Sequence, residues 1–104
     1  MRDAVTVFTD LEKAELIAFL AANPEAGSIV RETGGARKLR WRMRGRGKSG
    51  GARVIYYYHS ESLPLFLLNV FAKNEKANLN KAERNEITKL LPRLVEGYRK
   101  RIAI

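Results

Sequence analysis

The fold is decided by residues 37–58, which read RKLRWRMRGRGKSGGARVIYYY. Polar and apolar side chains alternate from Lys38 to Met43, the pattern of a strand with one buried face. Residues 53–58 are β-branched or aromatic after the initial arginine, which indicates a second strand. The glycine-rich segment 45–51 between them is typical of a loop. This stretch therefore predicts two antiparallel strands joined by a basic loop.

The alternation also divides the side chains of the first strand between two faces. Leu39, Trp41 and Met43 are expected to face the core. The opposite face then carries Lys38, Arg40, Arg42 and Arg44.

Outside this stretch, hydrophobic periodicity and capping signals predict five further elements. They are strands at 4–8 and 65–72 and helices from about 10, from about 24 to 30, and at 81–99. Pro92 lies inside the last helix and is expected to kink or break it. The order β-α-α-β-β-β-α predicts an α+β fold in one domain over residues 1–104. Its helices should pack on one face of an antiparallel sheet, leaving the basic side chains on the other.

Positive charge is concentrated in the same stretch. The chain has a formal net charge of +9 and a sequence pI near 10.3. Eight basic residues account for most of it: Arg37, Lys38, Arg40, Arg42, Arg44, Arg46, Lys48 and Arg53. No acidic residue occurs between Thr33 and Ser60. Because the positive charge is confined to one stretch, it indicates a polyanionic partner, either nucleic acid or an anionic membrane.

Composition and motifs argue against several other classes. With no cysteine, the chain has neither a disulfide nor a thiolate metal site. No apolar run approaches the length of a membrane span, and residues 1–10 lack a signal peptide's apolar stretch, so a cytoplasmic protein without membrane contact is expected. The acids are scattered, so no metal or other cofactor is expected. Gly47-Lys48-Ser49 fails as a phosphate-binding NTPase loop, because position 42 is arginine and a strand follows. His59 has no evident orienting partner in sequence.

The three consecutive tyrosines at 56–58 must alternate between faces of their strand. Tyr57 is expected in the core, while Tyr56 and Tyr58 reach the surface, where aromatic rings beside arginines can stack on RNA bases. The alternative, that all three simply fill the strand, carries equal weight.

Residues 34–41, 45–57 and 70–76 together resemble RelE-type toxins, most closely the HigB-like branch of bacterial type II toxin–antitoxin systems. The resemblance implies a ribosome-dependent endoribonuclease that cleaves mRNA in the ribosomal A site beside ribosomal RNA. It also implies neutralisation by a cognate antitoxin, often of the helix-turn-helix type. The family's basic positions fall on Lys38, Arg40, Lys48, Arg53 and Lys73, with Lys76 nearby. This chain has Asn74 where some relatives carry arginine, and Leu79-Asn80 where some carry tyrosine.

Metal-free RNA cleavage requires a 2′-hydroxyl to attack the adjacent phosphate while protons move and charge is neutralised. Arg40 and Arg53 are expected on the scissile phosphate, with Lys38, Lys73 or Lys76 in proton transfer. The predicted RNA-binding residues are Arg37, Arg42, Arg46, Lys48, Tyr56 and Tyr58. Two alternatives stay open, a gyrase-directed ParE-type toxin of the same fold and a non-catalytic RNA- or ribosome-binding module.

Overall fold

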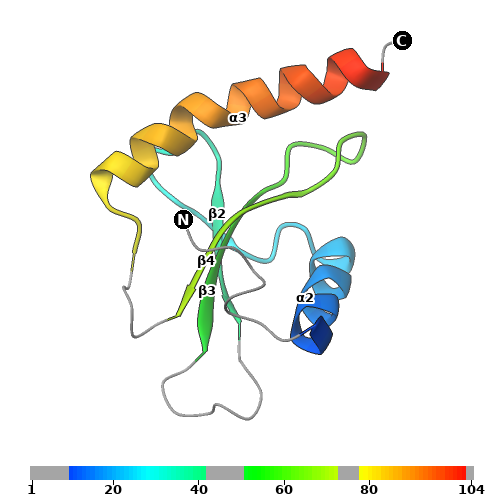
Figure 1. Ribbon diagram of the computed structural model, residues 1–104, viewed down its shortest axis with the longest axis vertical. Coiled ribbons are helices and arrows are strands. Elements are labelled where there is room, and N and C mark those ends of the chain that lie inside the picture. Colours follow the sequence, from blue (N-terminus) through cyan, green and yellow to red (C-terminus); the bar gives the residue numbers. More distant parts are fainter. Residues whose placement is uncertain (1–9, 42–50, 73–77, 103–104) are drawn as a thin grey trace.

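The computed structural model describes residues 10–41, 51–72 and 78–102 (Figure 1). Its elements in chain order are α2 (Asp10–Ala22), β1 (Ser28–Ile29), β2 (Arg37–Trp41), β3 (Ala52–Tyr57), β4 (Phe66–Ala72) and α3 (Lys81–Ile102). The predicted α+β class is confirmed. The strand predicted at 4–8 lies outside the described residues. Neither α2 nor α3 is long and apolar enough to cross a membrane.

The four strands form one antiparallel sheet in the order β1-β2-β3-β4. Each strand lies beside its neighbour in sequence, so short connections are enough. The three predicted strands near residues 38, 53 and 65 are all present, displaced at their starts by one residue. A register shift at Ile55/Tyr56 interrupts the ladder between β3 and β4.

The helix predicted at 24–30 is wrong. Residues 23–27 form a turn, in which Ala26 N donates to Asn23 O at 3.1 Å, and β1 then pairs with β2. A seven-residue helix is marginal in isolation. Here strand pairing and the Tyr56 hydroxyl, which donates to Pro24 O at 2.8 Å, stabilise the turn instead.

Two hydrophobic clusters lie on opposite faces of the sheet, so the expectation that both helices cover one face is wrong. The α2 cluster consists of Leu16, Leu20, Ala52, Val54, Tyr56 and Val70. The α3 cluster consists of Ala36, Ile55, Phe71, Leu79, Ile87 and Leu91. Successive residues of β3 alternate between the clusters, as side chains of a strand must. Figure 1 shows the two helices apart, with the strands between them.

Helix α2 begins at Asp10 as predicted, and only a narrow stripe of it is buried. Leu16 and Leu20 are buried, whereas Leu11 is 64% and Ile17 52% exposed. The buried side chains follow an i, i+4 row, which is narrower than the apolar content of the helix suggests.

Helix α3 begins with a capping box. Asn80 Oδ1 accepts from Glu83 N at 2.8 Å, and Glu83 Oε1 accepts from Asn80 N at 2.9 Å. The helix continues through Pro92 without the break that was one of the two expected outcomes. Its apolar stripe, which includes Ile87 and Leu91, is packed on the sheet, and this packing maintains the helix across the proline.

Candidate functional site

Three cationic side chains lie together on the side of the sheet that carries the α3 cluster. Arg40 of β2 is directly opposite Arg53 of β3 in the register, and Lys38 is opposite Ile55. Directly opposite residues point to the same face, about 5 Å apart at Cβ. Lys38, Arg40 and Arg53 therefore form one surface, called here the basic face. Like charges directly opposite one another destabilise a sheet, so folding alone does not account for this pair.

Arg53 is the most unusual member of the basic face because it is only 6% exposed. Its Nη1 is buried and has no hydrogen-bond partner among the described residues. A buried N–H without an acceptor costs about 1–3 kcal/mol, and more on a charged group. Arg84 also has a buried Nε without a partner in that part of the chain, but its guanidinium is paired with Glu32 at 3.5 Å. The Arg53 guanidinium therefore retains a donor that no described residue uses.

Lys38 is held by a residue that the sequence analysis did not identify. Its Nζ donates a hydrogen bond to Oδ1 of Asn78, which lies just before α3. The two residues are 40 positions apart, so no local pattern indicates the contact. This bond fixes the ammonium group near the N-terminal end of α3.

Three predicted RNA-binding residues do not join the basic face. Arg37 lies on the other face of β2 from Lys38 and Arg40. Its Nη1 donates to Gly27 O at 2.7 Å, and this bond links the turn before β1 to the sheet. Tyr56 is fully buried, so its prediction as a surface residue is wrong, as is the choice of Tyr57 as the main core tyrosine. Tyr58 is half-buried and packs against the α2 cluster.

Five predicted site residues lie outside the described residues: Arg42, Arg46, Lys48, Lys73 and Lys76. The described site therefore contains three of the five predicted catalytic residues. Among the described residues, no group of three histidine, aspartate or glutamate side chains is placed to hold a metal ion.

Comparison with protein families identifies the chain. A family model described as the RelE toxin of the RelE/RelB toxin–antitoxin system matches residues 9–103. The chain belongs to the RelE toxin family. It is therefore a toxin of a toxin–antitoxin system, and its partner is a cognate antitoxin.

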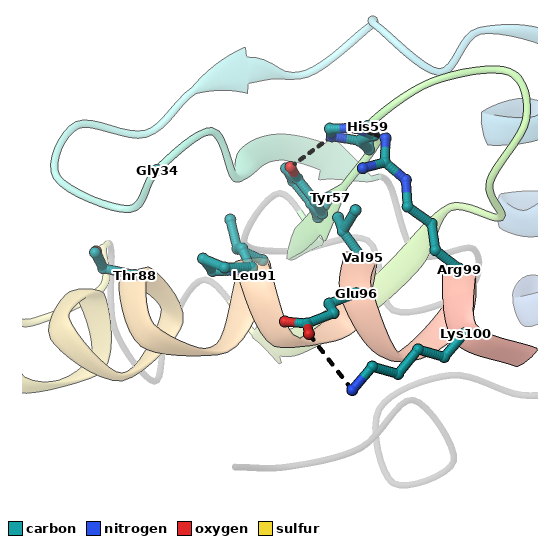
Figure 2. A pocket seen from close by; sticks show the side chains of 10 residues that line it. Gly34, Tyr57, His59, Thr88, Leu91, Val95, Glu96, Arg99 and Lys100 are labelled. Atoms are coloured by element: carbon teal, nitrogen blue, oxygen red, sulfur yellow. Dashed lines mark hydrogen bonds and ion pairs between the residues drawn. The ribbon is translucent and has the colours of Figure 1, made fainter.

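The RelE-family toxin also has a cavity of about 830 Å³ between α3 and the far end of β3. This α3 groove is lined mainly by Tyr57, His59, Leu91, Pro92, Val95 and Arg99. Figure 2 shows the helix forming its floor and the His59 ring on the opposite wall. The groove lies on the same side of the sheet as the basic face, but Lys38, Arg40 and Arg53 are not among the residues that line it.

The structure gives His59 two hydrogen-bond partners that the sequence did not make evident. Tyr57 Oη lies 3.0 Å from His59 Nδ1, and Arg99 Nη2 lies 3.2 Å from His59 Nε2. Since a guanidinium only donates, Nε2 must accept, and a neutral ring then carries its proton on Nδ1. In the RelE-family toxin, this chain of hydrogen bonds positions Arg99 at the rim of the groove.

Proposed function

We propose that this toxin is a ribosome-dependent endoribonuclease of the HigB-like branch, which cleaves mRNA without a metal ion and so inhibits translation in the cytoplasm. Cleavage begins when a 2′-oxygen attacks the adjacent phosphorus. The bond from phosphorus to the 5′-oxygen then breaks, leaving a 2′,3′-cyclic phosphate. A base takes the proton from the 2′-hydroxyl, and an acid returns one to the departing 5′-oxygen.

The observation that carries this proposal is the opposed pair Arg40 and Arg53, with the buried Nη1 of Arg53 that has no partner among the described residues. A phosphate between the two guanidinium groups supplies the missing acceptor and offsets their mutual repulsion. Charge-assisted hydrogen bonds to phosphate are among the strongest that proteins make. The strand register brings the two residues together, and in this proposal they stabilise the charge that grows on the phosphate oxygens.

In this proposal, Lys38 performs the second task, proton transfer at the attacking or departing oxygen. It lies two residues from Arg40 on the same face, and Asn78 restricts its ammonium group. Lys73 or Lys76 is proposed for the complementary proton transfer. Arg42, Arg46 and Lys48 bind the flanking phosphates in this proposal.

The test compares Arg40→Ala and Arg53→Gln with Arg31→Ala, which removes an exposed arginine outside the basic face. Each variant is induced at equal level, and mRNA ends are mapped by primer extension. Loss of one positioned donor to a developing charge lowers the rate by about 10²–10³. Cleavage within codons should therefore fall by about this factor in Arg40→Ala and Arg53→Gln, and it should not change in Arg31→Ala.

Three results contradict the proposal. Full cleavage by Arg53→Ala/Lys73→Ala would show that the basic face is not the catalytic site. Intact mRNA with DNA-damage signalling in the wild type would indicate a ParE-type toxin. Growth arrest with neither signal would indicate a non-catalytic binder.

A further inference from the structure

We infer that the α3 groove is a docking site for an acidic, amphipathic segment of the cognate antitoxin, separate from the basic face. The inference rests on family membership and on the groove itself, and it does not depend on the nuclease proposal. The groove binds the antitoxin in whichever way the toxin acts.

The floor of the groove is apolar and fits hydrophobic side chains. Pro92 presents exposed aliphatic surface from α3, the largely buried Leu91 and Val95 lie beside it, and Tyr57 faces them from β3. A volume of about 830 Å³ accommodates several side chains of a bound segment.

The rim of the groove is basic and fits a carboxylate. Among the described residues, Arg99 donates to a ring nitrogen of His59 and not to an acid, whereas Lys100 makes an exposed ion pair at 3.5 Å with Glu96, which also lines the groove. An incoming carboxylate meets a positioned guanidinium, which suits bidentate recognition.

The wall opposite α3 is fixed in place before any partner binds. Glu32 O accepts from Thr88 Oγ1 at 2.8 Å, and Glu32 Oε1 lies 3.5 Å from Arg84 Nη1. Glu32 (φ 61°) and Gly34 (φ 81°) both have left-handed backbone conformations, and Gly34 lines the groove. A preformed site needs little ordering on binding, which favours affinity.

Charge and chemistry select the antitoxin over other occupants. A second copy of the toxin also has a net charge of +9, so it would bring like charge to a basic rim. An RNA backbone finds phosphate ligands only at the rim, because the floor is apolar. An acidic, amphipathic segment of the toxin's own partner matches both the basic rim and the apolar floor of the groove.

The test uses the antitoxin, defined as the protein whose co-expression relieves growth arrest by this toxin. Its affinity for the separated full-length toxin is measured by calorimetry at two salt concentrations. The rim variant Arg99→Glu/Lys100→Glu is compared with Lys89→Glu/Arg93→Glu, which makes the same charge change on the same helix outside the groove lining. The rim variant should weaken binding by about tenfold or more, with a lower salt dependence, and the control by less than about threefold.

A second pair of variants tests the floor. Pro92→Glu puts a carboxylate where apolar contacts are expected, and Pro92→Ala does not, so only the first should weaken binding. Hydrogen exchange should show that the antitoxin protects residues 57–59 and 88–100.

Equal weakening of antitoxin binding by the rim and control variants, or unchanged affinity in both, overturns the inference. The inference is also overturned if the rim variant binds a 2′-O-methyl RNA more weakly but binds the antitoxin with unchanged affinity. That result would mean that the groove binds RNA. Cleavage by the free rim variant should equal wild type, so a failure here is distinct from a failure of the nuclease proposal.

Discussion

Tyr56 is the residue whose observed environment differs most from the one that the sequence predicts. Its buried hydroxyl accepts from Gly27 N at 2.8 Å and donates to Pro24 O at 2.8 Å. Gly27 permits this approach, because a Cβ there would lie 2.9 Å from the Tyr56 ring. Tyr56→Phe leaves the Gly27 N–H without an acceptor and should lower the free energy of unfolding by about 1–3 kcal/mol in urea titration.

Tyr58→Phe is the matched control for this prediction. The Tyr58 ring is half-buried against the α2 cluster, and its hydroxyl makes no hydrogen bond with a described residue. Its loss should therefore change stability by less than about 0.5 kcal/mol. Equal losses in the two variants would mean that the Tyr56 bonds contribute nothing specific.

At the residue scale, local alternation predicts which side chains of β2 share a face, but not what covers that face. Lys38 and Arg40 share a face as expected, and Arg53 joins them because of the strand register. The contacts Lys38–Asn78 and His59–Arg99 each span 40 residues, so periodicity contains no information about them. Both arise from the packing of α3 across the sheet, which only the folded chain determines.

At the scale of elements, the capping box of α3 is a feature that the spacing of Asn80 and Glu83 predicted correctly. Asn80→Ala removes the acceptor for Glu83 N and should cost about 1 kcal/mol. Asn85→Ala, within the same helix and exposed, should be neutral or slightly stabilising, because alanine has the higher helix propensity. Thermal unfolding monitored by circular dichroism distinguishes them, and a stabilised Asn80→Ala would contradict the capping role.

Pro92 gives a second test at this scale. Pro92→Ala restores the N–H that the Thr88 carbonyl lacks, so the free energy of unfolding should rise, by up to about 3 kcal/mol. Pro64→Ala, at an exposed position in the turn before β4, should instead lower it by about 0.4–1 kcal/mol, because the unfolded chain gains freedom. Urea titration measures both, and a fall for Pro92→Ala would mean that proline packing matters more than the missing bond.

At the scale of the whole molecule, one sheet separates two hydrophobic clusters, and the sequence contained a signal for this. After Arg53, residues 54–58 are all apolar or aromatic, and a strand buried on both faces has this composition. The alternation of residues 38–43, in contrast, predicts a strand with one buried face. In fact α3 covers part of the face that carries Lys38, Arg40 and Arg53, and this packing brings Asn78 to Lys38.

The distribution of charge over the molecule gives the last prediction. If RNA binds the basic face and the antitoxin binds the α3 groove, salt should report on them separately. Each phosphate contact with a single strand contributes about 0.7 to the slope of log affinity against log salt. Lys38→Ala/Arg40→Ala should therefore reduce the slope for an uncleavable 2′-O-methyl RNA by about 1.4. Arg99→Ala/Lys100→Ala removes the same charge from the groove rim and should change that slope by less than about 0.5, since it removes no phosphate contact. Equal changes in the two variants would mean that RNA responds to the net charge of +9 and does not distinguish one end of the sheet from the other.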